Sequence, residues 1–225
     1  MKRSVLLSSM LALTLASPLA QAYKQGDMIV RAGAIMVDPT VDDSSVSTTA
    51  TGKIPGSKAT VDSDTQLGLT LSYMIRDHVG IELLAATPFK HEVGLKGIGG
   101  GLDGQLSTIE QLPPTLSLQY FPLDSSSKWQ PYIGAGINYT TFFNEELTSA
   151  RKAQGFSHLD RESSWGLALQ AGLDYMLTDK VILNAAVWRI DIDGVATARH
   201  SALGKVEVDI DINPWVYMVG VGYRF

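Results

Sequence analysis

The chain has 225 residues, no cysteine and a formal net charge of −5. Without cysteine it has no disulfide and no thiolate that could serve as a nucleophile or metal ligand. The acidic balance argues against nucleic-acid binding, which needs a basic surface facing the phosphates.

Residues 1–22 have the pattern of a secretory signal peptide. A basic start precedes a mostly apolar run, Val5 to Leu15, and Ala20-Gln21-Ala22 is an Ala-x-Ala cleavage site. The apolar run is too short for a membrane helix, which needs roughly 20 residues. We therefore expect export, cleavage after Ala22 and a mature domain of residues 23–225.

The rest of the chain alternates large apolar residues with small or polar ones at a period of two, which is typical of β-strands with two different faces. In 163–177, for example, the odd positions from Trp165 to Leu177 are mostly large and apolar. Eight strands are predicted in this way, at 27–37, 61–75, 79–91, 112–121, 131–143, 163–177, 181–192 and 206–225. In the last of them the parity changes near Asn213-Pro214, which indicates a bulge or a strand that rises out of the membrane.

The connections between these strands alternate in length. Three are short, at 76–78, 122–129 and 178–180, and four are long and polar, at about 38–60, 93–110, 144–161 and 194–205. Short turns at one end and long loops at the other are typical of outer-membrane barrels, in which a closed ladder pairs every backbone polar group within the lipid. The predicted fold class is all-β, an eight-stranded antiparallel transmembrane β-barrel.

A soluble eight-stranded barrel of the lipocalin kind would show the same alternation. Three features favour the membrane: aromatic residues near the strand ends of the apolar face, small and polar residues on the other face, and the terminal stripe WVYMVGVGYRF (215–225). Such a stripe resembles the signature by which outer-membrane barrels are recognised for insertion. Tyr223 and Phe225 are therefore predicted as an assembly signal for the barrel-assembly machinery.

Four charged residues fall on the inward face in the half of the barrel that carries the short turns: Arg31, Glu82, Asp174 and Arg224. Eight strands leave an interior that side chains can fill, which excludes a broad aqueous pore. Isolated charges would be costly there, so we expect them to be paired in a periplasmic plug. The same residues are expected whether their role is to fill a small barrel or to seal it. A path for ions or protons through them is the remaining alternative.

Six segments carry a family resemblance: GIELLAATPFKHEV (80–93), QLPPTLSLQYFP (111–122), QPYIGAGINYTTFF (130–143), SWGLALQAGLDYML (164–177), VWRIDID (187–193) and DINPWVYMVGVGYRF (211–225). The chain resembles the OmpW family and is most similar to its OprG-type members. The resemblance implies an eight-stranded barrel with an apolar channel that opens from outside and is blocked toward the periplasm. It also implies uptake of small hydrophobic molecules through a lateral opening, with Leu84 and Trp188 at positions that line the constriction.

Prolines provide a physical basis for such an opening. Pro88 lies in the third predicted strand, and Pro113 and Pro114 lie in the fourth, roughly opposite it. Each proline removes a donor from the ladder and is tolerated only at edges or bulges. We expect the three to separate the wall locally, although they could also simply end a strand early.

Two functions remain from the sequence. The first is an outer-membrane channel for passive uptake of small, largely hydrophobic or weakly polar molecules. The alternative is a surface-display or envelope-interaction protein, a receptor or adhesin, with an inert lumen. The four histidines show no nucleophile and base spacing, so we expect no enzyme activity, no cofactor and no metal site. The expected partners are outer-membrane lipid and lipopolysaccharide, the solutes and the assembly machinery.

Overall fold

The computed structural model describes residues 23–41 and 44–225, without the side chains of residues 209–211. The predicted signal peptide, residues 1–22, lies outside the described residues. Eight strands form the wall of a barrel: β1 (Met28–Asp38), β5 (Asp64–Arg76), β6 (Val79–Ala86), β9 (Thr115–Tyr120), β10 (Trp129–Leu147), β12 (Ser164–Met176), β13 (Val181–Ile190) and β16 (Trp215–Arg224). The fold class predicted from the sequence is confirmed.

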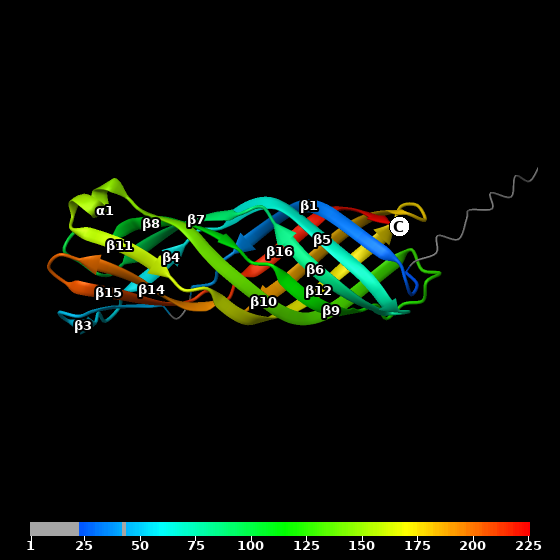
Figure 1. Ribbon diagram of the computed structural model, residues 1–225, viewed down its shortest axis with the longest axis horizontal. Helices are drawn as coiled ribbons and strands as arrows, with labels where there is room; N and C mark the ends of the chain where they lie inside the picture. Colours follow the sequence, from blue (N-terminus) through cyan, green and yellow to red (C-terminus); the bar gives the residue numbers. More distant parts are fainter. Residues whose placement is uncertain (1–22, 42–43) are drawn as a thin grey trace, which may run out of the picture.

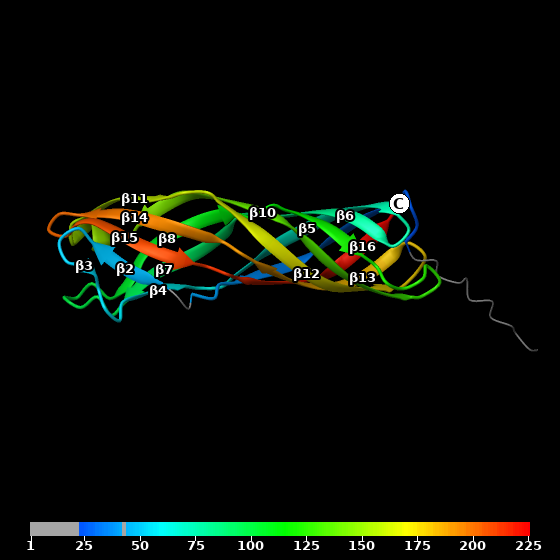
Figure 2. The ribbon, with the colours of Figure 1, turned by 90° about the horizontal axis from the view of Figure 1, so that it is seen from below.

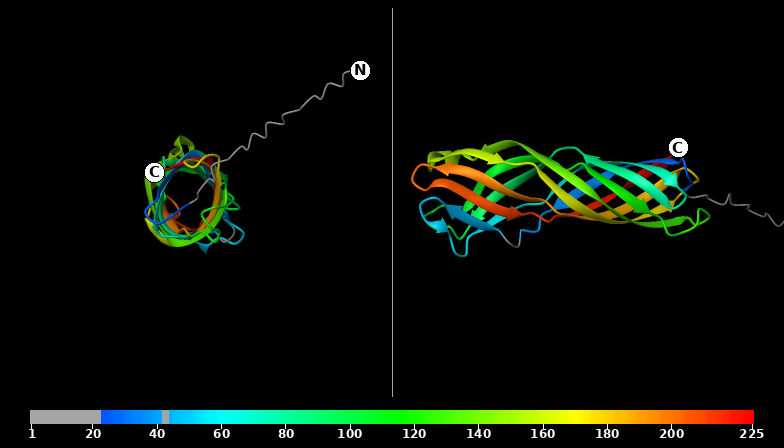
Figure 3. Two further views of the ribbon diagram at one scale, coloured as in Figure 1. Left: turned by 90° about the vertical axis from the view of Figure 1, so that its right-hand side faces the viewer. Right: turned by 60° about the horizontal axis from the view of Figure 1, so that its bottom comes forward.

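Each wall strand pairs antiparallel with both of its neighbours, in the order β12-β13-β16-β1-β5-β6-β9-β10, and β10 pairs with β12 to close the ring. The first and last wall strands are joined along almost their whole length, from Ile29 opposite Arg224 to Asp38 opposite Trp215. Viewed along its long axis, the molecule is a closed ring (Figure 3). A closed ring leaves no sheet edge, as a strand-built membrane protein requires.

A second tier of strands, which we call the outer tier, continues the barrel at the end away from the C-terminus (Figure 1). It comprises the upper part of β10, a short helix α1 (Ser149–Ala153) and the following strands: β2 (Ser45–Thr48), β3 (Gly52–Lys53), β4 (Lys58–Val61), β7 (Phe89–Lys96), β8 (Gly104–Leu112), β11 (Phe156–Arg161), β14 (Asp193–His200) and β15 (Gly204–Asp211). They form two sheets, β10-β8-β7-β4 and β11-β14-β15-β2-β3. The strands of both sheets are seen in Figure 2.

The prediction of four long loops was wrong, because most of those residues belong to these sheets. Their strands pair with segments distant in the sequence: Val46 lies opposite Val208, for example, and Val61 lies opposite Val93. Several of these strands bury alternate side chains between the two sheets and expose others, as β2 and the first half of β7 do. The polar residues of these segments lie on the exposed faces, so composition alone does not indicate that the segments are strands.

Two predicted strands are each two strands in the structure, and a third is shorter than predicted. The segment 79–91 is divided into β6 and β7 around Thr87-Pro88. Within 112–121 only β9 is a wall strand, because Leu112 is the last residue of β8 and Pro113-Pro114 separate the two strands. The last segment is divided into β15 and β16 at residues 212–214, where the parity change had indicated a strand rising out of the membrane. Proline accounts for all three breaks, since it cannot donate a hydrogen bond to a ladder.

The outer surface of the eight-stranded barrel wall, below the outer tier, is apolar. Its exposed large side chains come from every wall strand and include Leu67, Leu69, Leu71, Leu83, Leu116, Leu118, Ile133, Ile137, Leu167, Leu169, Leu183, Val219 and Val221. Aromatic pairs lie toward the two ends of this zone, Trp129 with Tyr175 at 4.5 Å and Tyr139 with Trp165 at 4.7 Å between ring centroids. An apolar band between aromatic girdles matches a lipid bilayer. Within the described residues, no helix is long and apolar enough to cross a membrane.

The interior contains two separate apolar clusters. The lower one fills the barrel and includes Ile35, Leu84, Phe89, Trp188 and Met218. The upper one lies between the two outer sheets. Its buried residues are Val46, Ala59, Leu95, Leu106, Leu147, Phe156, Ala196, Ala198, Val206, Val208 and Ile212. The outer tier therefore has a core of its own and is more than a set of connecting loops.

Candidate functional site

The periplasmic half of the lumen is occupied by an ion-pair network centred on Arg31 of β1. Its guanidinium lies 2.5 Å from a carboxylate oxygen of Asp174 on β12 and 3.1 Å from one of Glu82 on β6. All three side chains are at most 1% exposed. The structure thus brings together three of the four residues predicted for a plug, from strands on different sides of the barrel.

Neutral polar groups complete this network. Ser72 accepts a hydrogen bond from Arg31 at 2.8 Å, and Gln170 donates to Glu82 at 2.7 Å. Asn184 donates to Asp174 at 2.7 Å and to the Tyr132 hydroxyl at 3.0 Å, and the Tyr23 hydroxyl donates to Asp174. Pairing and hydrogen bonds of this kind offset the cost of burying charges. The plug is a polar layer across the barrel in which the charged groups are paired, while the Oδ1 atom of Asn184 has no partner within the described residues.

Arg224 lies outside the plug. Its guanidinium is 3.5 Å from Asp27 at the periplasmic rim, where the two side chains are 16% and 22% exposed. The sequence places Arg224 correctly on the inward face, but at the end of β16 that face meets water. The parity of a strand gives the direction of a side chain, whereas depth along the barrel decides its partner.

Sequence reasoning missed Tyr23, Ser72, Tyr132 and Gln170 as members of the network. Three of them stand on wall strands at inward positions, so the parity that identified Arg31 also points to them. Tyr23 precedes β1 and has no strand to give it a direction. Its ring packs edge-on against Phe121 at 5.1 Å, and its hydroxyl reaches Asp174. Nothing in the local sequence indicates that contact.

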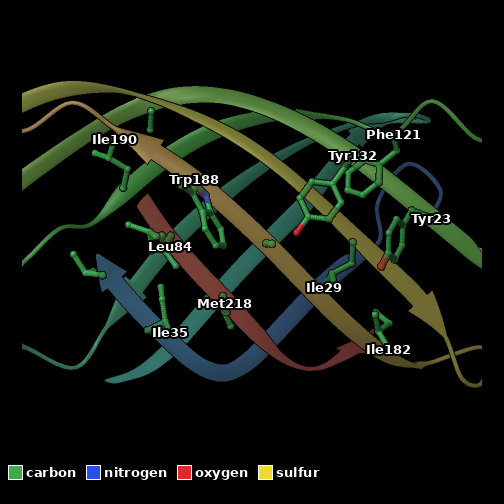
Figure 4. Close-up of a cluster of buried hydrophobic side chains, with 14 of the residues drawn as sticks. Tyr23, Ile29, Ile35, Leu84, Phe121, Tyr132, Ile182, Trp188, Ile190 and Met218 are labelled. Atoms are coloured by element: carbon green, nitrogen blue, oxygen red, sulfur yellow. The ribbon is translucent and has the colours of Figure 1, made fainter. Parts of the chain in front are cut away.

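Above the plug, Leu84 and Trp188 lie in the lower apolar cluster, 3% and 1% exposed. Figure 4 shows them directed toward the same region of the lumen, close to Ile35 and Met218. The indole nitrogen of Trp188 has no hydrogen-bond partner among the described residues. Both side chains are packed within this cluster, and we call the pair the apolar collar.

The three prolines lie at a seam in the wall. The β6–β9 ladder ends at Leu84 opposite Thr115, and the β7–β8 ladder begins at Phe89 opposite Gln111. Between these ends, 85–88 and 112–114 have no register with each other. We call this stretch the proline seam.

Each segment of the proline seam is hydrogen-bonded to the strand on its far side, 85–88 to β5 and 112–114 to β10. Thr87 donates its backbone N–H to the carbonyl oxygen of Leu67 on β5 at 2.9 Å. Tyr139 of β10 donates to the carbonyl oxygen of Pro114 at 3.0 Å, and the buried Asn138 amide donates to the carbonyl oxygens of Pro113 and Pro114 at 3.1 and 3.2 Å. These backbone groups are therefore bonded away from the seam, and no ladder register joins 85–88 to 112–114 across it.

Tyr223 and Phe225, predicted as the assembly signal, both face outward at the periplasmic end. Their ring centroids are 4.8 Å apart, and Phe225 is 66% exposed. The backbone N–H of Phe225 donates to the carbonyl oxygen of Met28, which extends the β16–β1 ladder to that residue. The placement makes both rings accessible from the lipid, and the assembly role itself stays a prediction.

Among the described residues, no group of three or more His, Asp or Glu side chains is arranged to hold a metal ion. Arg31, Glu82 and Asp174, which are buried in the lower lumen, pair with one another instead.

Comparison with known proteins agrees with this architecture. The model of the OmpW family matches residues 24–225. Outer membrane protein W of Vibrio cholerae is 42% identical over 225 residues, which is 100% of both chains, and that of Escherichia coli is 42% identical over 94% of both. The crystal structure of the outer membrane protein OprG from Pseudomonas aeruginosa superposes with a TM-score of 0.86 at 52% identity, over 91% of this chain and 98% of that one.

Proposed function

Because the chain belongs to the OmpW family and is an outer-membrane β-barrel, we propose that it is a channel for passive uptake of small, largely hydrophobic or weakly polar molecules. A solute enters from the outer tier, meets the apolar collar of Leu84 and Trp188, and leaves sideways into the membrane through the proline seam, which lies just above the level of Leu84. The proposal is carried by one observation: the wall lacks a ladder at Pro88, Pro113 and Pro114, above a lumen that is sealed below.

The plug accounts for the sideways exit. Straight passage to the periplasm would require separation of Arg31 from Asp174 and Glu82, which would leave charges unpaired in a dry interior. Opening the proline seam requires no such separation, since its backbone groups bond to β5 and β10. The lateral route therefore meets the lower barrier.

The collar selects apolar solutes by burial. Apolar surface removed from water there is stabilised by about 25 cal/mol for each Å². Because the collar side chains are packed against one another, a solute replaces existing apolar contacts and gains only part of that energy. Such partial compensation suits a passive channel, in which a bound solute must also leave.

The test compares uptake of a solute panel, from alkyl alcohols to amino acids, by liposomes that contain equal amounts of folded protein, after subtraction of the rate in protein-free liposomes. Pro88→Ala restores a backbone donor at the proline seam and should slow uptake several-fold. Trp188→Ala widens the collar and should accelerate it. Pro55→Ala, in the exposed turn between β3 and β4, is the matched control and should equal the wild type.

A second function is favoured by the outer tier, whose two sheets enclose their own apolar core. This part could present a surface to a partner, such as lipopolysaccharide or another envelope component, while the lumen stays inert. Equal uptake rates for wild type, Pro88→Ala and Trp188→Ala would reject the lateral route and favour display.

A further inference from the structure

The carbonyl oxygen of Pro113 is the acceptor that an unbroken wall would offer across the proline seam. The register of 112–115 against β10 is continuous through both prolines. Tyr139 of β10 donates to the carbonyl oxygen of Pro114, and successive carbonyl groups of a strand point to opposite neighbours. In a regular strand the carbonyl oxygen of Pro113 would therefore point away from β10, toward 85–88.

Ala86 carries the matching donor on the other side of the seam. The backbone N–H of Thr87 donates to the carbonyl oxygen of Leu67 on β5 at 2.9 Å. Because successive N–H groups also alternate, the N–H of Ala86 points the other way, toward the seam. Two residues further on, the same direction falls to Pro88, which has no N–H to donate. The donor that 85–88 can direct across the seam is thus that of Ala86.

This donor and this acceptor lie at matching positions of the two strands. The β6–β9 ladder ends at Leu84 opposite Thr115, and two residues beyond that pair are Ala86 on one strand and Pro113 on the other. A continued ladder would therefore place the N–H of Ala86 against the carbonyl oxygen of Pro113. The ladders of the described residues contain no such pair, so a group other than proline has to account for the missing bond.

Asn138 of β10 binds the carbonyl oxygen of Pro113 instead. Its side-chain amide donates to this oxygen at 3.1 Å, to that of Pro114 at 3.2 Å and to the Thr115 hydroxyl at 2.9 Å. Carbonyl oxygens can only accept, so the nitrogen end of the amide must face the prolines. Thr140 donates to the amide oxygen at 2.7 Å and holds the group in this orientation. Both side chains are completely buried.

The segment that carries Ala86 is fixed to β5 by a second set of bonds. Besides the bond of its backbone N–H, Thr87 accepts the N–H of Leu67 on its hydroxyl at 3.2 Å, and that hydroxyl donates to Gln66 at 3.0 Å. The donor of Ala86 is therefore held in one place. The direction of the Pro113 carbonyl group decides whether the two groups bond.

We propose that Asn138 is a positioning residue for the lateral exit, because its amide binds the carbonyl oxygen of Pro113 on the lumen side and so keeps the proline seam unpaired. A buried carbonyl group needs a donor, and Asn138 supplies one in place of Ala86. The prolines remove donors from the seam, and Asn138 removes the remaining acceptor. This inference rests on the proposed channel for its role in uptake, whereas the hydrogen bond itself is tested without transport.

The test is an NMR measurement on the barrel in nanodiscs, which detects the coupling through a hydrogen bond between the amide nitrogen of Ala86 and the carbonyl carbon of Pro113. We expect no coupling in the wild type. Asn138→Leu removes the amide. Because a carbonyl oxygen has two lone pairs, Thr115 can keep its bond to Pro113 at 3.2 Å while Ala86 donates beside it. The coupling should then appear, and amide exchange of Ala86 should slow about fivefold, as expected for one hydrogen bond of ordinary strength.

Two further variants make the test specific. Thr140→Val leaves the Asn138 amide without the donor that orients it. It should change both readouts in the same direction by less, which keeps the test available if Asn138→Leu does not fold. Thr70→Val replaces a buried inward hydroxyl that has no hydrogen-bond partner within the described residues; it is the control and should match the wild type. Uptake in the liposome assay, at equal folded protein, should fall several-fold in Asn138→Leu.

A coupling between Ala86 and Pro113 in the wild type would overturn the inference, as would its absence from both Asn138→Leu and Thr140→Val. Faster amide exchange of Ala86 in these variants would give Asn138 a purely structural role, because general loosening of the wall lowers protection where the proposed bond raises it. The channel is tested separately. A coupling that appears in Asn138→Leu while uptake stays at the wild-type rate would reject the lateral exit and retain the hydrogen-bond role of Asn138.

Discussion

Arg31 and Asp174 lie 143 residues apart in the chain and form a bidentate ion pair inside the barrel, with both Nε and Nη2 of the arginine directed at the carboxylate. β1 and β12 are not adjacent in the wall, so the pair spans the lumen. The same guanidinium also reaches Glu82 on a third strand. Arg31 thus links β1, β6 and β12 across the lumen and blocks the space between them.

Asp174→Asn should destabilise the barrel by roughly 3–5 kcal/mol, because it removes one charge of a buried pair and leaves the other undercompensated. Urea unfolding in detergent micelles measures the change. Asp27→Asn, which affects the partly exposed pair with Arg224 at the rim, should cost at most about 1 kcal/mol. Similar unfolding midpoints for Asp174→Asn and wild type would mean that water reaches the plug.

Gly172→Ala should also destabilise the barrel, by about 1–3 kcal/mol. A Cβ atom at this position would lie 2.2 Å from the Tyr132 ring, which is held by Phe121 at 5.1 Å and by the amide of Asn184. Tyr132→Leu in the same chain should recover part of the loss, since it removes the clashing atoms. Strict additivity of the two substitutions in a double-mutant cycle would show that the ring moves aside freely.

Phe225→Ala should reduce insertion into the outer membrane more than it reduces the stability of the folded protein. The side chain is 66% exposed, so the folded protein loses little buried apolar area when it is removed. The aromatic stripe, however, then lacks the residue that we propose guides assembly. The comparison is the membrane-inserted fraction in cells at equal expression against the urea midpoint of refolded protein. Normal insertion would remove Phe225 from the proposed signal.

Because the pKa of His91 is lowered, we expect the outer tier to lose stability in acid. Burial lowers its pKa, opposed by its hydrogen bond to the carbonyl oxygen of Asp62 and by the charges of Asp62 and Asp64, while Arg161 lowers it further. The unfolded state then binds the proton more readily than the folded state. The stability contribution is full above pH about 6.5, the value for an unperturbed histidine, and is lost as the pH falls from there to the lower folded pKa.

The measurement is the unfolding free energy at pH 7.5 and 5.5 in wild type and His91→Gln, which should lose less stability on acidification. His158→Asn, at an exposed residue of β11, serves as the control and should follow the wild type. Identical losses in wild type and His91→Gln would assign the acid sensitivity to other groups.

The wall of the barrel can be predicted from local patterns in the amino-acid sequence. A strand has a period of two, so one-dimensional alternation is enough to divide Leu67, Leu69 and Leu71, which face lipid, from Thr70 and Ser72, which face the lumen. The short turns and the prolines are also local signals, because each acts on the backbone where it stands. The eight wall strands and the proline seam therefore follow from residues read in order.

Which residues come into contact depends on pairings between distant parts of the chain. The outer tier is built from pairings such as Val46 with Val208, and the plug joins Arg31 to Asp174 while Arg224, equally inward by parity, binds Asp27 at the rim. Arg161 of β11 stacks on Phe142 of β10, a contact between two sheets that no local pattern predicts. Periodicity fixes the direction of a side chain about its own strand, whereas its partner and its exposure depend on the register and depth of strands far away in the chain.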